Sequence, residues 1–157
     1  MPLSGLLAGL AISLGLATSG VRADETDDTA LAFVQQRHLG EGLGWLSYQL
    51  ASRTAVFASL VDTLGKPRAQ ALVQSELQRL QPLYQGQWEQ NLASAYAHSF
   101  SAEELRQLNE GQGDATLRSR LKARNNEVSQ EMKARSSDLL SEFVNRALQN
   151  AQNSLTP

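Results

Sequence analysis

The sequence predicts an all-α fold, a small bundle of about five helices that ends in a long, straight C-terminal helix. Apolar residues recur at spacings of three and four through most of the chain, and no stretch alternates apolar and polar residues as a half-buried strand does. The chain of 157 residues has room for one core, and its apolar fraction of 41% is ordinary for a globular domain.

The amino-terminal segment differs in composition from the rest of the chain. The stretch from Leu3 to Leu16 contains only apolar, Gly and Ser residues, and Val21-Arg22-Ala23 has small residues at both positions that direct signal cleavage. A membrane-spanning helix needs about 20 apolar residues, which is more than this stretch supplies. We therefore expect a signal peptide at residues 1–23 and a single mature domain at residues 24–157 in the periplasm. A retained membrane anchor is the alternative.

Charge and cysteine content argue against several classes of function. Removal of Arg22 with the signal peptide leaves 13 of the 14 basic residues in the mature chain, against 16 acidic residues. This negative balance argues against general nucleic-acid binding. The sequence contains no cysteine, which excludes disulfides, thiolate metal sites and a catalytic thiol. His38 and His98 each lack a second histidine at ligand spacing, so we expect no metal.

The first two helices are predicted from caps, glycines and apolar spacing. Asp27 or Asp28 can cap a helix that begins at about Thr29, and a Gly-rich turn from Gly40 ends it. From Trp45 to Leu64 the apolar residues follow helical spacing on one stripe, and few charges interrupt them. We expect this second helix to be the most enclosed of the bundle.

The next two helices have clear start signals. Gly65 ends the preceding helix, and Pro67 suits the first turn of a helix that starts near Lys66. Its apolar period continues across Pro82, so the sequence allows either one kinked helix or two. The run Ser101-Ala102-Glu103-Glu104 has the spacing of a capping box, which predicts a short helix that starts at Ala102.

The last helix is expected from about Ala115 to Asn150, with Asp114 or Thr116 as its cap. In steps of 11 residues its apolar side chains form two columns: Leu117, Val128 and Leu139, and Leu121, Met132 and Phe143. Eleven residues make about 3.67 residues per turn over three turns, which is close to the natural helix. The repeat therefore predicts a long, nearly straight helix packed along one side.

The same repeat aligns three arginines beside the apolar stripe. They are Arg124, Arg135 and Arg146. One interpretation makes them a ladder for an anionic partner. The interpretation that we favour pairs Arg135 with Glu131 and Arg146 with Glu142, because each acid stands four residues before its arginine.

A local run of positive charge precedes this ladder. It consists of Arg118, Arg120, Lys122 and Arg124. If any segment of the chain contacts an anionic membrane surface, we expect it to be this one. A solvated basic turn is the plainer interpretation, because alternating positions spread the charges around a helix.

Arg53 is the cation that the sequence places closest to the expected core. It lies between Leu50 and Phe57 on the stripe of the second helix, and a buried guanidinium needs a partner. That partner is either Glu76 or Glu89, as an ion pair, or an anionic ligand inside the bundle; alternatively, the side chain extends past the apolar stripe to water. In the second case, the aromatic residues that line the ligand pocket with Arg53 are Trp45, Tyr84 and Trp88; the plainer interpretation makes them core residues.

A short motif carries a family resemblance. From Tyr96 to Leu105 the chain reads Tyr-Ala-His-Ser-Phe-Ser-Ala-Glu-Glu-Leu. This motif resembles a family of bacterial periplasmic proteins known only as a domain of unknown function, and the likeness covers about residues 80–148. The family's Ser-Pro-x-Gly turn is replaced here by residues 110–115. The resemblance implies an all-helical, exported protein and brings no catalytic residues.

Two functions follow as hypotheses. The first is a non-enzymatic interaction protein of the cell envelope, whose partner is another envelope protein or the anionic membrane surface. The second is a carrier or sensor that binds a small apolar or amphiphilic anion near Arg53. No arrangement of residues indicates a catalytic centre or a cofactor, so we do not expect an enzyme.

Overall fold

The structure is a computed structural model that describes residues 19–156, so the apolar run Leu3 to Leu16 lies outside the described residues. This range is all-helical and contains no strand, which confirms the predicted fold class. The helices are α1 (Ser19–Gln36), α2 (Leu43–Ala51), α3 (Ala55–Leu64), α4 (Lys66–Ser99), α5 (Ala102–Asn109), α6 (Ala115–Ala123) and α7 (Asn125–Asn153). These seven helices exceed the expected five or so, because two predicted helices are each broken by a turn.

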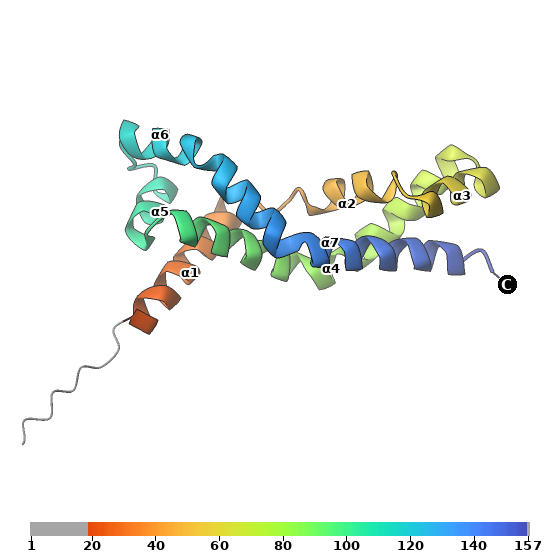
Figure 1. Cartoon of the computed structure of the whole chain (residues 1–157), viewed down its shortest axis with the longest axis horizontal. Coiled ribbons are helices and arrows are strands. Elements are labelled where there is room, and N and C mark those ends of the chain that lie inside the picture. The colour runs from red at the N-terminus through yellow and green to blue at the C-terminus, as the bar shows by residue number, and fades with distance from the viewer. Residues whose placement is uncertain (1–18, 157) are drawn as a thin grey trace, which may run out of the picture.

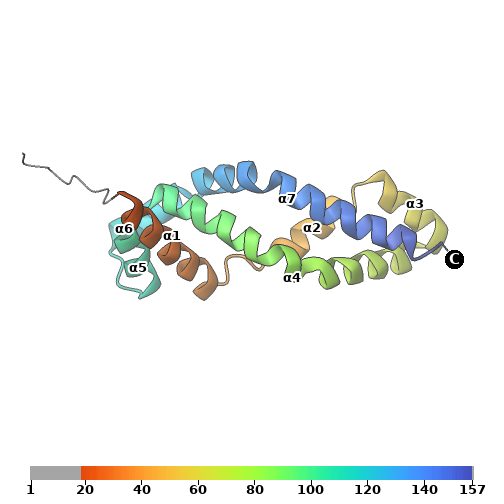
Figure 2. The ribbon, with the colours of Figure 1, turned by 90° about the horizontal axis from the view of Figure 1, so that it is seen from below.

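Helices α4 and α7 form the centre of the molecule and lie side by side along most of its length (Figure 2). Tyr84 stacks on Phe143, with their ring centroids 4.7 Å apart. Asn91 donates a hydrogen bond to Ser136. Along α4 the residue numbers rise while their partners on α7 fall, so the two helices are antiparallel.

The remaining helices pack around this pair (Figure 1). Helices α1, α5 and α6 lie at one end, α3 lies at the other, and α2 lies over the middle of the pair. Phe33 of α1 packs edge-on against Tyr96 of α4, with their centroids 5.1 Å apart. The buried apolar side chains of both ends join those of α4 and α7 in one hydrophobic core.

The first helix starts earlier than expected. α1 begins at Ser19, ten or so residues before Thr29, and continues through Asp27 and Asp28 without a cap at either. The hydroxyls of Thr26 and Thr29 donate to the carbonyls of the residues four positions before them, which is compatible with an unbroken helix.

The single helix predicted from Trp45 to Leu64 is wrong, because a turn at residues 52–54 divides it into α2 and α3. The hydroxyl of Ser52 donates to the carbonyl of Gln49. The hydroxyl of Thr54 donates to the carbonyl of Ala51 and accepts from the backbone N–H of Phe57, which makes Thr54 the cap of α3. Side-chain bonds to the backbone therefore compete with the helix at this point.

The predicted C-terminal helix is also divided, at Arg124. α6 ends at Ala123 and α7 continues from Asn125 to Asn153, so the final helix is long. The guanidinium of Arg124 donates to the carbonyl of Ser99 and lies 5.7 Å from the ring centroid of Phe100, which ties this junction to the end of α4. The early turns of α7 slope relative to its later turns, so the expected straight helix is wrong (Figure 1).

The other end signals act as predicted. α4 is one helix of 34 residues that continues through Pro82, whose side chain is exposed. Asp114 accepts from the backbone N–H of Leu117 at 2.7 Å and caps α6. Ser101 and Glu104 form the full capping box of α5. Both apolar columns of the repeat are buried or partly buried.

Candidate functional site

An apolar groove of about 640 Å³ lies between α2, α4 and α7. The α7 side of the groove consists of two neighbouring rows of side chains, each with a spacing of four residues. The floor row is Val128, Met132, Ser136 and Leu140, and the rim row is Asn125, Ser129, Lys133, Ser137 and Ser141. From end to end the rim row extends along about 24 Å of helix, since each residue rises about 1.5 Å.

The opposite walls come from α4, α2 and the turn before α2. α4 contributes Trp88, Leu92 and Tyr96, and α2 contributes Leu46 and Leu50.

Burial raises the pKa of the Tyr96 phenol, although Arg37 lowers it in part. The hydroxyl of Tyr96 therefore stays protonated and neutral at physiological pH.

The polar atoms of the groove have few partners. Ser136 is 1% exposed; its hydroxyl accepts from Asn91 at 3.1 Å and donates to the sulfur of Met132 at 3.4 Å. The indole N–H of Trp88 is buried and has no hydrogen-bond partner among the described residues. Lys133 is exposed at the rim and is the single charged residue among the described residues that line the groove.

The described lining of the groove is mainly apolar. Of the described residues that line the groove, none is a histidine, cysteine, aspartate or glutamate. Apolar side chains on rigid helices, with a few polar groups at the edge, are typical of a site that buries an apolar molecule.

The structure corrects the predicted role of Arg53. It is exposed in the turn between α2 and α3 and does not line the groove, so the two interpretations that bury it, as an ion pair or against a ligand, are wrong. The helix break turns its side chain away from the core. Its two expected partners are engaged elsewhere: Glu76 pairs with Arg79 at 2.6 Å, and Glu89 accepts from Gln35 and Gln85.

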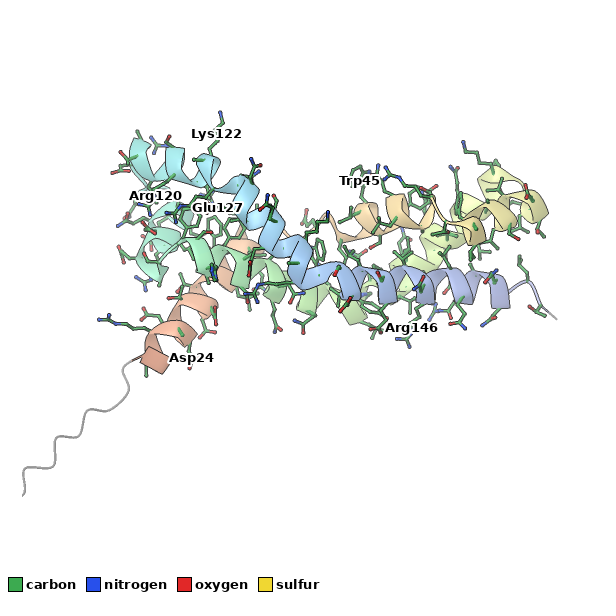
Figure 3. The ribbon with its side chains drawn as sticks, in the orientation of Figure 1. Asp24, Trp45, Arg120, Lys122, Glu127 and Arg146 are labelled. Atoms are coloured by element: carbon green, nitrogen blue, oxygen red, sulfur yellow. The ribbon has the colours of Figure 1, made fainter. Side chains whose placement is uncertain are left out.

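The three predicted aromatic residues are not brought together. Trp88 is 8% exposed and lines the groove. Trp45 is 66% exposed on α2, which also contradicts the expectation that this helix is the most enclosed (Figure 3). Tyr84 belongs to the core, where it stacks on Phe143 and donates to Glu142 at 3.1 Å.

Sequence reasoning missed the two rows of α7 that shape the groove. The repeat did place Val128 and Met132 on the packed side. The signal for the rim was the spacing of Ser129, Lys133 and Ser137, which puts hydroxyls one turn before and after a lysine.

Three of the four cations in the basic run make contacts within the molecule. Arg118 donates to the carbonyl of Gly113, Arg120 pairs with Glu104 of α5, and Arg124 donates to Ser99. Lys122 instead projects away from α6 (Figure 3). The run therefore helps to hold α6 against its neighbours.

The two predicted salt bridges of the arginine ladder differ. Arg135 pairs with Glu131 at 2.8 Å, as expected. Glu142 does not form the predicted bridge with Arg146, because its carboxylate accepts from the Tyr84 hydroxyl. That hydroxyl in turn accepts from Arg146 at 3.4 Å, so Tyr84 lies between the two charges.

The capping box makes a pH-dependent contribution to stability. Burial raises the pKa of Glu104, but the hydrogen bond from the Ser101 backbone and the contacts with Arg120 outweigh it, so the pKa is lower than usual. The ionised form therefore stabilises the fold above the unfolded-state pKa, and this contribution is lost as the pH falls through the folded-state pKa.

We expect Glu104→Gln to be less stable than the wild type at neutral pH, and we expect the difference to shrink as the pH falls from about 5 to about 3. Urea unfolding followed by circular dichroism at several pH values measures this difference. Glu103→Gln is the matched control, because it removes a carboxylate of the same turn that takes no part in the capping box. A difference between Glu104→Gln and the wild type that is constant with pH would contradict the prediction.

Between residues 19 and 156, no helix is both long and apolar enough to cross a membrane. Over the same part of the chain, no group of three or more His, Cys, Asp or Glu side chains is arranged to hold a metal ion.

The comparisons with known proteins add no family to this description. The resemblance of residues 96–105 to a periplasmic family therefore stays a prediction. No protein-family profile, no curated protein and no solved structure matches this chain.

Proposed function

We propose that this protein is an exported, non-enzymatic binding protein of the bacterial cell envelope, and that the groove between α2, α4 and α7 binds an apolar or amphiphilic small molecule. The observation that carries the proposal is the groove itself, with its floor of Val128, Met132 and Leu140. An apolar surface of this kind is unfavourable in water, so a molecule that covers it binds with a gain in free energy.

The size and construction of the groove support a small-molecule ligand. Its volume of about 640 Å³ falls within the range of about 300 to 1,000 Å³ that is usual for such sites. Its longest walls belong to α4 and α7, the helices that also form the core. A site on packed helices keeps its shape, which lowers the entropic cost of binding.

Export is supported by the sequence. The apolar run before Thr18 and the small residues at Val21 and Ala23 are typical of a cleaved signal peptide. The motif from Tyr96 to Leu105 resembles periplasmic proteins. Both features agree with a protein that acts in the periplasm.

A second candidate function is contact with another envelope protein. The observation that favours it is Trp45, which is 66% exposed on α2. Tryptophan is enriched at the centre of protein interfaces, where its large surface is buried by the partner. Trp45 follows Gly44 and precedes the groove residue Leu46, so a partner that covers Trp45 also lies close to the groove.

Fluorescence quenching tests the proposed function. The protein is exported by a bacterial host as Trp45→Phe, which leaves Trp88 in the groove wall as its one tryptophan. We expect a long-chain alcohol with bromine atoms on its chain to quench Trp88 in a saturable way, because bromine quenches at close contact.

Trp88→Phe is the matched control, because it retains the exposed Trp45 outside the groove lining. Its fluorescence should show no saturable quenching at the same concentrations of alcohol. If the alcohol does not quench Trp88 although circular dichroism shows that the Trp45→Phe protein is folded, the groove does not bind apolar chains and the proposal fails.

A further inference from the structure

We propose that the groove selects amphiphiles with a single extended chain and an anionic carboxylate head, and that Lys133 binds this head. The inference rests on the proposed function, because it assigns a class of ligand to the same groove. It depends on the charge of the rim, the position of Lys133 along it and the absence of acid from the described lining.

Lys133 is a cation without an acidic partner. The residues three and four positions away from it on α7 are Ser129, Gln130, Ser136 and Ser137, and none of them is acidic. Of the ion pairs found between described residues, none includes Lys133. By contrast, Arg135 on the same helix has Glu131 four residues before it and pairs with it at 2.8 Å. The charge of Lys133 is therefore available to a ligand.

The position of Lys133 suits a head group. It occupies the middle of the rim row, with Ser129 one turn before it and Ser137 one turn after it. A lysine in this position lays its aliphatic stem along the apolar surface and keeps its ammonium group at the water boundary. The hydroxyl of Ser129 donates to the carbonyl of Asn125 at 2.8 Å, so the donors that face a carboxylate here are the ammonium group of Lys133 and the hydroxyl of Ser137.

The floor suits the chain of the same molecule. Met132 and Ser136 lie beside Lys133 in the neighbouring row, with Val128 and Leu140 at the ends of that row. A chain that lies on this row buries apolar surface while its head remains at the rim. The groove therefore offers one apolar row for a single hydrocarbon chain and one cation, Lys133, for a single anionic head group.

The sign of the charge selects the head. The groove lining contains one cation and, in the part of the chain that the structure describes, no carboxylate. A carboxylate gains a charge-assisted hydrogen bond from Lys133, whereas an alcohol gains a weaker one and an ammonium head is repelled. We therefore expect a carboxylate to bind about three- to tenfold more tightly than an alcohol with the same chain.

Three brominated probes of one chain length test the inference, in the Trp45→Phe protein at about pH 8, where a carboxylate is ionised. The probes are a fatty carboxylate, the matching alcohol and the matching trimethylammonium compound, all below the concentrations at which they form micelles. Quenching of Trp88 measures the three dissociation constants. We expect the carboxylate to bind most tightly and the trimethylammonium compound most weakly.

Variants assign the preference to Lys133. Lys133→Gln should bind the carboxylate and the alcohol equally, and Lys133→Glu should favour the trimethylammonium compound. Lys122→Gln is the matched control, because it removes an exposed lysine of α6 that does not line the groove. Its preference for the carboxylate should equal that of the parent protein.

The outcomes separate the two proposals. If the alcohol binds as tightly as the carboxylate in the parent protein, or if Lys133→Gln keeps the full preference, the inference about Lys133 is overturned and the proposed function stands. If none of the three probes quenches Trp88 in a saturable way, the proposed function fails and the inference fails with it.

Discussion

Replacing Phe143 with alanine should lower the free energy of unfolding by about 3–5 kcal/mol, which is the usual cost of removing a buried aromatic side chain. Phe143 is 0% exposed and lies where α4 and α7 meet. Its ring stacks on Tyr84 at 4.7 Å with an angle of 24° between the planes, so the substitution removes this contact and leaves a cavity. Urea unfolding followed by circular dichroism measures the change.

An exposed leucine on the partner helix provides the control for Phe143. Leu83 of α4 is 66% exposed, so Leu83→Ala should change the free energy of unfolding by no more than about 0.5 kcal/mol. If Phe143→Ala costs less than about 1 kcal/mol, the contact between α4 and α7 is not the centre of the core and the arrangement of the two helices is wrong.

Replacing Leu140 with glutamate should weaken the binding of apolar ligands by at least about tenfold while the protein stays folded. Leu140 is partly buried and belongs to the floor row of the groove. A carboxylate there loses hydration when a ligand covers it, and that cost exceeds the roughly 1.4 kcal/mol that corresponds to a tenfold change. Quenching of Trp88 by the brominated alcohol measures the loss.

The neighbouring leucine separates binding from stability. Leu139 is also partly buried and packs against the core, but it does not line the groove. Leu139→Glu and Leu140→Glu should therefore lower the free energy of unfolding by similar amounts, while only Leu140→Glu loses the ligand. Equal affinities in the two variants would show that the ligand binds elsewhere.

The ends of several helices could be predicted because their signals are local. Ser101 and Glu104 are three residues apart and satisfy each other's backbone donors within one turn. Asp114 caps α6 through a neighbour three residues on. Gly65, with a positive φ of 81°, ends α3 in a conformation that favours glycine. None of these features depends on distant parts of the chain.

The two helix breaks illustrate what a periodic pattern misses. The apolar period continues from α2 into α3 and from α6 into α7, so periodicity alone predicts unbroken helices. At Thr54 the cap of α3 is local, but our prediction did not consider it and followed the apolar stripe. At Arg124 the bond to Ser99 joins residues 25 positions apart, which no local pattern reveals.

The candidate site could be predicted only in part, for the same reason. The ligand hypothesis placed both Trp88 and Arg53 in a pocket; Trp88 lines the groove, whereas Arg53 is exposed in a turn. The error followed from the missed break, since an unbroken helix would keep Arg53 between Leu50 and Phe57 on one stripe. Lys133 was not singled out, because its role depends on which helices face α7.

The sequence by itself determined the all-α class, the caps of α5 and α6 and the packed side of α7, because hydrogen bonds within a turn and helical periodicity depend on neighbours in the chain. The tertiary structure alone decided that α4 and α7 form the centre, that α2 lies beside them and that a groove forms between the three. These features depend on which apolar faces meet, and residues far apart in the sequence supply those faces.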